Sequence, residues 1–261
     1  MSIFEALILG LIQGITEFLP VSSSGHLEIA KSLFGLEAES SFYFTVAVHG
    51  ATVLSTVIVF REEIKKLLSA GLQLRLNADN EYNIKIIFSM IPVAFAGFFF
   101  KDTIEEMFKG NVVFVGIMLI VTSLLLLAGH FLGLKNRGKD IGYIDAFIIG
   151  IAQAIAVIPG ISRSGATIST GLMLGVKKDE ITKFSFLMVL VPVIGANLVE
   201  LLTGDVIKGD VNGTILATGF LAAFFSGFLA CKWMISLVRK SRIIWFSIYC
   251  LLAGILAIIA G

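Results

Sequence analysis

Six long apolar stretches decide which class of fold this chain can adopt. They cover residues 41–60, 84–100, 111–133, 184–202, 213–235 and 243–260. About 20 apolar residues in a helix cross a hydrocarbon core of about 30 Å, so each stretch is long enough to span a membrane. Only 15% of the residues are charged, whereas about a quarter are charged in soluble proteins. The sequence therefore predicts an all-α integral membrane protein with six transmembrane helices in one membrane domain, residues 1–261.

Two further apolar stretches, about 3–34 and 142–175, are interrupted in the middle by Pro, Ser and Gly. Such clusters of turn-forming residues are not typical of a simple span. No Lys or Arg precedes Lys31, and Gln13 and Glu17 interrupt the first apolar run, so a cleaved signal peptide is not expected. Each interrupted stretch is therefore predicted to form a re-entrant helix–loop–helix hairpin.

The two interrupted stretches are copies of one another at an offset of 140 residues. When residues 6–25 are aligned with residues 146–165, eight of the twenty positions are identical, and one of them pairs Gln13 with Gln153. Each copy is followed by three of the predicted spans. The chain is therefore expected to consist of two repeats of one structural unit.

A re-entrant hairpin followed by three crossings turns the second repeat upside down, so the repeats, about 1–135 and 141–261, are predicted to be inverted. The positive-inside rule places Lys and Arg on the cytoplasmic side of a membrane protein. With the N-terminus outside, fifteen of the 20 Lys and Arg residues fall on the inner side. Most of them lie in residues 61–83, 133–141, 175–183 and 236–242. Both termini are therefore predicted outside, and the charged run Arg61 to Lys66 is expected to be a solvated loop.

The hairpin tips are predicted to meet near the middle of the membrane, where non-helical backbone is tolerated only inside protein or beside a wet cavity. In the first hairpin, Gln13 and Glu17 are four residues apart and share a helix face. Pro20 is expected to end that helix. A polar turn follows, with the residues Ser22, Ser23, Ser24, Gly25 and His26. The second tip, residues 159–167, repeats this plan with Arg163 in the place of Ser23.

These residue types predict an anion site. A helix that opens on a Ser- and Gly-rich turn presents free N–H groups and the positive end of its dipole. The planar Arg163 guanidinium can hold two phosphate oxygens at once, so the natural ligand is a phosphate or a diphosphate. Glu17 does not fit as an anion binder. It is predicted either to hold a divalent cation that bridges phosphates or to act as a base on a hydroxyl.

Each of these residues also has a structural interpretation. The Ser turns can serve as helix caps, and Arg163 can clamp backbone carbonyls. Glu17 can be solvated at the membrane interface, and His49 can be a packing residue inside a span. Ionisable residues within a membrane are expensive to bury and usually functional, which favours a site.

The motif Q-G-I-T-E-F-L-P-V-S-S-S-G-H at 13–26 and the motif P-G-I-S-R-S-G-A-T at 159–167 closely resemble the two signature regions of the undecaprenyl-diphosphate phosphatase family, the bacitracin-resistance phosphatases. Residues 42–52, 91–97 and 184–193 also resemble the intermediate helices of that family. The resemblance implies a multi-pass enzyme of the bacterial inner membrane. Such an enzyme hydrolyses undecaprenyl diphosphate to undecaprenyl phosphate and phosphate, and so recycles the lipid carrier for peptidoglycan and other cell-wall polymers.

The family motifs, transferred position by position, imply a set of site residues and a site open to the outer side. The catalytic residues would be Glu17, Ser23, His26 and Arg163, and the substrate-binding residues Gly160, Ser22, Ser24, Ser162, Ser164 and Thr167. A magnesium ion, or another divalent cation, would be bound through Glu17 and Gln13. Gln13 stands where many relatives have Glu, which leaves one carboxylate fewer for the metal, and Ser24 stands where Thr is frequent.

As a mechanism we expect Ser23 to attack the terminal phosphorus while Glu17 or His26 removes its proton, with His26 as nucleophile in the less favoured version. A flippase for polyprenyl phosphate, or another inverted-repeat transporter, is the alternative from a different functional class. The expected partners are the polyprenyl diphosphate substrate and membrane lipids. A net charge of +1 without a basic run gives no indication of nucleic-acid binding. A homodimer is compatible with the sequence.

Overall fold

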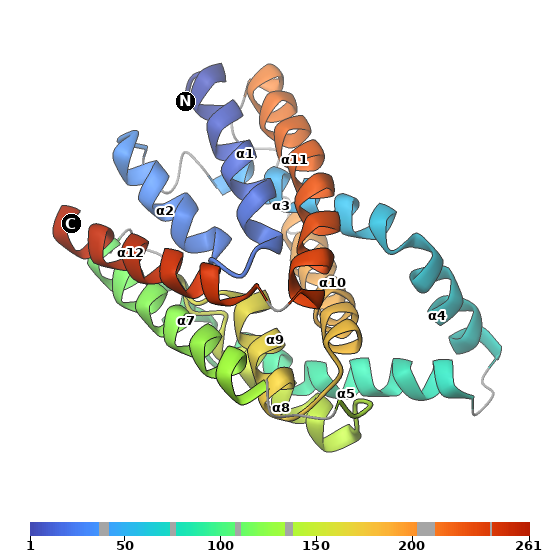
Figure 1. Cartoon of the computed structure of the whole chain (residues 1–261). Helices are drawn as coiled ribbons and strands as arrows, with labels where there is room; N and C mark the ends of the chain where they lie inside the picture. The colour runs from blue at the N-terminus through green and yellow to red at the C-terminus, as the bar shows by residue number, and fades with distance from the viewer. Residues whose placement is uncertain (37–41, 74–76, 108–110, 134–137, 203–211, 241) are drawn as a thin grey trace.

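The computed structural model describes the chain outside residues 37–41, 74–76, 108–110, 134–137, 203–211 and 241. The described residues form the helices α1 (Ile3–Phe18), α2 (Ser23–Leu33), α3 (Phe42–Val59), α4 (Arg61–Gln73), α5 (Ala78–Phe99), α6 (Lys101–Met107), α7 (Val112–Gly133), α8 (Tyr143–Ile155), α9 (Arg163–Met173), α10 (Lys178–Leu202), α11 (Gly213–Arg239) and α12 (Ile244–Ala260) (Figure 1). Extended backbone pairing in this part of the chain is limited to one bridge between Lys139 and Val176. The predicted all-α class is confirmed.

Three of the described helices, α5, α7 and α11, are long and apolar enough to cross a membrane. A fourth span is possible if α3 and α4, which meet at an angle of 80°, count as one broken span. The helix α12 coincides with a predicted stretch but has 17 residues, and α10 opens with charged residues. Several apolar helices thus make this a multi-pass membrane protein.

The exposed surface is strongly apolar, as expected of helices that face lipid. Phe98 is 80% exposed and Ile144 is 76% exposed, whereas Ser89 and Thr122 are fully buried between helices. In lipid the hydrophobic effect does not drive helices together, because the lipid tails are themselves apolar. Helices associate instead through close packing at small residues. Polar and small residues therefore concentrate inside the helix bundle, and bulky apolar residues lie outside.

The two halves of the chain are interlocked by exchanged helix contacts. The N-terminal helix α1 packs on α11, and its counterpart α8 packs on α5. A Cβ atom on Gly10 of α1 would collide with the carbonyl oxygen of Gly219 in α11, and one on Gly150 of α8 would collide with that of Ser89 in α5. Gly10 and Gly150 are 140 residues apart, so equivalent glycines provide equivalent close approaches in the two halves.

One expectation about the first inner segment is wrong. The charged run that starts at Arg61 is not a loop, because it begins helix α4. Glu62 and Glu63 lie in its first turn, where acidic side chains stabilise the positive end of the helix dipole. The helix then packs on α5, and Lys66 pairs with Asp79 at 2.8 Å. The run is nevertheless solvated, since the Arg61 side chain is 69% exposed.

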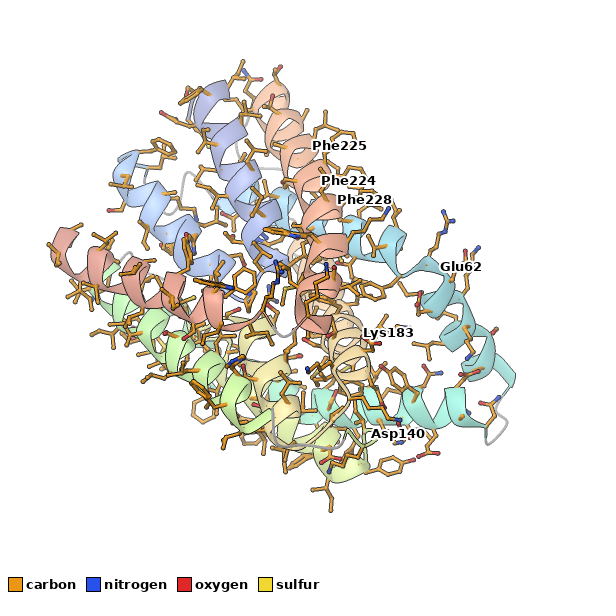
Figure 2. All side chains as sticks on the ribbon, viewed as in Figure 1. Glu62, Asp140, Lys183, Phe224, Phe225 and Phe228 are labelled. Carbon is orange, nitrogen blue, oxygen red and sulfur yellow. The ribbon has the colours of Figure 1, made fainter. Side chains whose placement is uncertain are left out.

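The charged and the aromatic side chains labelled in Figure 2 lie on different parts of the molecule. In Figure 2, Glu62, Lys183 and Asp140 lie along the side formed by α4, α10 and the segment before α8. Phe224, Phe225 and Phe228 lie together on α11, and Phe225 is 61% exposed. The aromatic flank also carries charge, because Lys232 Nζ lies 4.2 Å from the centroid of the Phe228 ring.

Candidate active site

The tips of two helix pairs meet in the middle of the molecule. The turn between α1 and α2 faces the turn between α8 and α9 (Figure 1). Ser164 Oγ donates a hydrogen bond to the Leu19 carbonyl at 3.4 Å, and a Cβ on Gly25 would lie 3.1 Å from the Gly160 Cα. The α1 helix ends at Phe18, just before Pro20, which cannot donate to the helix. Residues about 140 apart in sequence are therefore in direct contact.

The Glu17 carboxylate is the centre of the polar cluster at these tips. Its Oε2 atom accepts hydrogen bonds from Ser23 Oγ at 2.5 Å and from Gln13 Nε2 at 3.0 Å. Its Oε1 atom accepts from Arg163 Nη2 at 2.5 Å, which pairs the charges. The Glu17 side chain is 12% exposed and the Arg163 side chain 28%. The structure thus brings together Glu17, Ser23 and Arg163, three of the four residues predicted to be catalytic, with Gln13 on the same helix face as Glu17.

His26, the fourth predicted catalytic residue, makes hydrogen bonds that do not involve Ser23. Its Nδ1 atom lies 2.8 Å from the Ser22 carbonyl, and its Nε2 atom lies 2.7 Å from the Tyr249 hydroxyl. A carbonyl only accepts, so Nδ1 carries the proton and Nε2 is free to accept from Tyr249. The His26 and Tyr249 rings stack with their centroids 5.5 Å apart. The arrangement makes His26 a neighbour of the cluster rather than a partner of its hydroxyl.

Ser22 and Ser162 act as helix N-caps at equivalent positions. Ser22 Oγ accepts from the Gly25 amide at 3.2 Å, and Ser162 Oγ accepts from the Gly165 amide at 3.1 Å. The capping interpretation therefore holds for both residues. Ser22 also has a φ of 68°, which is strained for a residue with a side chain.

The remaining predicted substrate-binding residues line the same two turns. Ser24 Oγ lies 3.3 Å from Ser22 Oγ, and Thr167 Oγ1 lies 2.6 Å from Ser185 Oγ of α10. Within the described residues, the first two backbone amides of α2 and of α9 make no hydrogen bond. Each tip therefore presents free N–H donors beside hydroxyl groups, at the positive end of a helix.

The polar cluster borders a small cavity of about 30 Å³. The polar residues on its wall are Glu17, Thr52, Thr56, Gln153, Arg163, Ser164, Thr167 and Ser185, and the rest of the wall is apolar. Arg163 is paired with Glu17 in this state. A diphosphate is larger than this cavity, so binding one requires the walls to move apart.

The oxygen ligands at the cluster suit a cation that binds together with a phosphate ligand. They suit a metal ion bound by the protein alone less well. Among the described residues, no group of three or more His, Cys, Asp and Glu side chains is arranged to bind a metal. Gln13 Oε1, however, is a buried acceptor without a donor in the described part of the chain, and it belongs to the side chain that holds Glu17. Magnesium is commonly bound by one or two carboxylates together with substrate phosphates and water.

Sequence reasoning missed three residues of the site. Tyr249 contacts His26 from α12, Ser185 contacts Thr167 from α10, and Thr122 of α7 bonds the second turn. Thr122 Oγ1 accepts from the Ser162 amide at 3.0 Å and donates to the Gly160 carbonyl at 3.0 Å. Thr122 and Tyr249 lie far from the two polar motifs in sequence, inside apolar helices. Ser185 falls in the 184–193 stretch that resembles the family, but its contact with Thr167 could not be read from that resemblance. His49 instead bonds its own helix, with Nδ1 2.8 Å from the Thr45 carbonyl.

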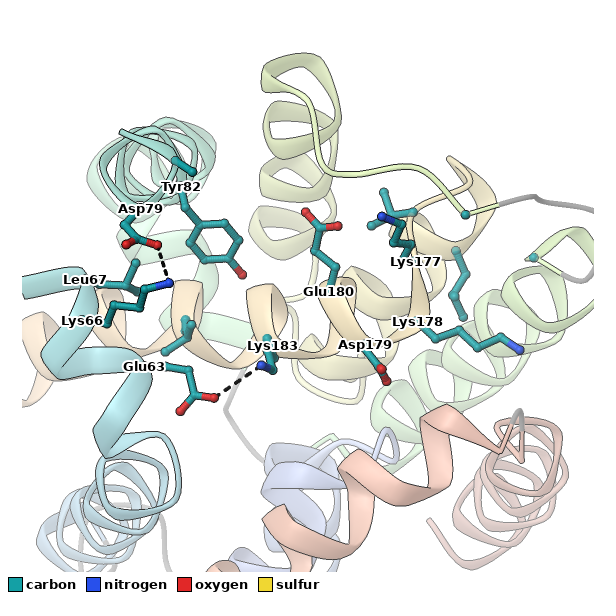
Figure 3. A pocket seen from close by; sticks show the side chains of 16 residues that line it. Glu63, Lys66, Leu67, Asp79, Tyr82, Lys177, Lys178, Asp179, Glu180 and Lys183 are labelled. Carbon is teal, nitrogen blue, oxygen red and sulfur yellow. Dashed lines mark ion pairs between the residues drawn. The ribbon is translucent and has the colours of Figure 1, made fainter. Parts of the chain in front are cut away.

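A larger cavity of about 860 Å³ lies elsewhere and contains none of the predicted site residues. Its wall combines parts of three predicted inner segments, represented by Glu63, Tyr82, Gly138 and Lys183. Figure 3 shows its ion pairs, Lys66 with Asp79 at 2.8 Å and Lys183 with Glu63 at 3.4 Å. The wall carries as many lysines as acidic residues, so its net charge indicates neither an anionic nor a cationic ligand.

Gly160 is expected to be indispensable for the second turn. Its φ is 93°, and a Cβ atom would lie 2.6 Å from the Met118 Cβ and 2.7 Å from the Val115 carbonyl oxygen. Replacing Gly160 with Ala should therefore cost about 1–3 kcal/mol in backbone strain, with the clash added. Thermal unfolding of the purified protein in detergent should begin at a lower temperature. Gly97→Ala is the matched control, because no atom approaches within 4 Å of its Cβ position in α5 and alanine favours a helix.

The chain is similar to known proteins over nearly its whole length. A family model described as bacitracin resistance protein BacA matches residues 6–256. The undecaprenyl-diphosphatase of Christiangramia forsetii is 49% identical to this chain over 261 residues, which cover 99% of this chain and 98% of that protein. The undecaprenyl-diphosphatase of Parabacteroides distasonis is 50% identical over 262 residues, with the same coverage. That of Alkaliphilus metalliredigens is 36% identical over 276 residues, again with 99% and 98% covered. The chain therefore belongs to the BacA bacitracin resistance family.

Proposed function

We propose that this chain is an undecaprenyl-diphosphate phosphatase whose active site is the Glu17 cluster. It hydrolyses undecaprenyl diphosphate to undecaprenyl phosphate and phosphate, which returns the carrier lipid to cell-wall polymer synthesis. Family membership and full-length similarity to undecaprenyl-diphosphatases support the reaction. The observation that carries the site is the double contact of Glu17, with Arg163 on one oxygen and Ser23 on the other.

Arg163 is proposed to bind the diphosphate. In the substrate-free arrangement the Glu17 carboxylate occupies the guanidinium as a phosphate oxygen would. A bound diphosphate competes for the same guanidinium, and the free amides and hydroxyls of both turns provide further donors. Phosphoryl transfer depends chiefly on positioning and on charge stabilisation, which are the contributions that these groups can make.

When Arg163 turns to the diphosphate, Glu17 keeps its contact with Ser23. Glu17 can therefore act as the base for the Ser23 hydroxyl. The Ser23 hydroxyl attacks the terminal phosphorus while its proton passes to Glu17 Oε2. The anhydride P–O bond breaks, and undecaprenyl phosphate departs with the electron pair. Water then hydrolyses the phosphoserine, releasing phosphate and restoring the hydroxyl. The position of His26, bonded to Ser22 and Tyr249, supports Glu17 rather than His26 as the base.

Glu17 and Gln13 Oε1 are proposed to hold a magnesium ion together with the substrate. When bound, the cation would offset the charge of the diphosphate and help to orient it. The orphaned Gln13 Oε1 atom supports this proposal, because a buried acceptor without a donor is unfavourable unless a ligand satisfies it.

Purified protein in detergent is expected to release phosphate from undecaprenyl diphosphate only when magnesium is present. Chelation with EDTA should abolish the release, and added magnesium should restore it, because Glu17 is the one carboxylate that the described residues place in the cluster and it holds the cation weakly without substrate. The measurement is free phosphate over time. Absence of release with magnesium present would instead favour the carrier function that broken helices in two halves also permit.

The proposed membrane arrangement has six crossings, two re-entrant hairpins in inverted repeats, both termini outside and the active site open to the outer side of the inner membrane. The larger cavity supports this arrangement, because the segments that border it include Lys66, Gly138 and Lys178 from three predicted inner segments. Two backbone hydrogen bonds link two of those segments directly: the Lys139 amide donates to the Gly175 carbonyl at 2.8 Å, and the Lys177 amide donates to the Lys139 carbonyl at 3.0 Å. Dimer formation remains a prediction from the sequence.

Cysteine labelling is expected to distinguish residues on the outer side of the membrane from residues on the inner side. A membrane-impermeant thiol reagent should modify Gly213→Cys in intact cells, because that exposed position begins α11 on the proposed outer side. Lys66→Cys should be modified only after permeabilisation, since the Lys66 side chain is 67% exposed on the proposed inner side. Cys231 and Cys250 are both buried and give a low background. The reverse labelling pattern would refute the orientation.

A further inference from the structure

Gln153 is a buried amide without a hydrogen-bonding partner in the described part of the chain. It lies near the end of α8 and is 1% exposed. Neither its Nε2 nor its Oε1 atom has a partner among the described residues. The side chain borders the small cavity together with Glu17 and Arg163. An unpaired buried amide is unfavourable, so a residue that served packing alone would be better replaced by an apolar one.

The internal repeat explains why this amide is free. Its counterpart, Gln13, donates to Glu17 four residues later. The position four residues after Gln153 is occupied by Val157, which offers no side-chain acceptor. Repeat 2 therefore keeps the amide and lacks the carboxylate, and the amide remains available on the wall of the cavity.

We propose that Gln153 is a substrate-binding residue whose Nε2 group donates a hydrogen bond to a non-bridging oxygen of the diphosphate that Arg163 holds. The proposal rests on the function and site proposed above. An anionic phosphate oxygen only accepts, so it matches the free donor. A neutral donor also adds affinity without a second positive charge beside Arg163. The binding site then draws on the α8 helix of the second hairpin as well as on the two turns.

The test uses Gln153→Met, which keeps the size of the side chain and removes both hydrogen-bonding atoms. Inorganic pyrophosphate serves as the probe, because it carries the diphosphate group without the lipid. It is measured as a competitive inhibitor of phosphate release from undecaprenyl diphosphate by the full-length protein. A hydrogen bond to a charged group changes affinity about 10- to 100-fold, so the inhibition constant should rise by at least about tenfold. The unfolding temperature should stay the same or rise, because an unpaired amide has been removed.

Ser169→Ala is the matched control. Ser169 Oγ is also buried and unpartnered within the described residues, but Ser169 lies against Gly129 of α7 and does not border the cavity. This variant should keep the same inhibition constant, with an unchanged or higher unfolding temperature. Gln153→Glu is the second variant. It preserves the size of the side chain and places an acceptor with negative charge in the cavity, so pyrophosphate should inhibit it even more weakly than Gln153→Met.

An unchanged pyrophosphate inhibition constant in both Gln153 variants would overturn the inference. Arg163→Lys in the same assay separates this failure from failure of the proposed site. If Arg163→Lys weakens inhibition and the Gln153 variants do not, only the role of Gln153 is wrong. If none of the three changes inhibition, the site itself is wrong.

Discussion

Replacing Arg163 with alanine should lower kcat/KM for undecaprenyl diphosphate by about 10³-fold or more. Arginines that stabilise a transferring phosphoryl group contribute about 10³ to 10⁵ in rate. Arg163 is the charged group that reaches across from the second hairpin to Glu17 in the first, at 2.5 Å. Its loss removes the guanidinium that faces the diphosphate and also leaves Glu17 without its charged partner. Phosphate release in detergent with magnesium is the measurement.

Two further variants make the Arg163 prediction specific. Arg163→Lys retains the charge without the planar fork, so part of the activity should return. Arg61→Ala is the control, because Arg61 is 69% exposed in α4 and pairs with Glu62, away from the cavity. It should behave as the unaltered protein does, since exposed ion pairs contribute little. An Arg163→Ala protein that folds and retains more than a tenth of the activity would contradict the proposed site.

Replacing Glu17 with glutamine should lower kcat by about 10² to 10⁴, the range typical of a lost general base. Glutamine has nearly the same shape, and it removes the charge and the proton acceptor that face Ser23 at 2.5 Å. Glu28→Gln is a matched control. The Glu28 side chain is 13% exposed, close to the 12% of Glu17, but it pairs with Lys31 at 3.3 Å rather than with the cluster.

Ser23→Ala sharpens the same prediction, because a nucleophile and its base act as one unit. Either single substitution should cause most of the loss, and the Glu17→Gln, Ser23→Ala double variant should be little worse than the more damaging single one. Losses that multiply in the double variant would mean that the two residues act independently. In that case Glu17 would serve the cation or Arg163 rather than the hydroxyl.

Much of the architecture was predictable because it depends on periodic and local features. The apolar stretches coincide with helices, since burial in lipid requires every backbone group to be bonded within its own segment. Pro20 and the Ser-rich turns predict where the first hairpin breaks, and Ser22 and Ser162 cap the helices that follow. The run after Arg61 was misread as a loop because its charges mask the apolar spacing of Ile64, Leu67 and Leu68 in helix α4.

The sequence predicted those residues of the site that lie in the two repeated motifs. The alignment places Glu17 opposite Val157 and Arg163 opposite Ser23, so each charge occurs in one repeat only, and their chemistry indicates that they belong to one phosphate site. The alignment carries no information on Tyr249, Ser185 or Thr122, which approach from α12, α10 and α7. Such contacts depend on how the helices pack against the two turns, which the repeat pattern does not encode.

The sequence alone is sufficient to derive a helical membrane protein, the duplication and the two polar breaks, because composition and residue order encode all three. The state of individual polar groups depends on packing between the halves. It is this packing that sets Arg163 on Glu17 and leaves the Gln153 amide without a partner among the described residues, whereas the bond from Gln13 to Glu17 lies within α1 and follows from their spacing. The physical reason is that hydrogen bonding of a buried group depends on its distance to other groups in space, and folding brings together residues about 140 positions apart in the chain.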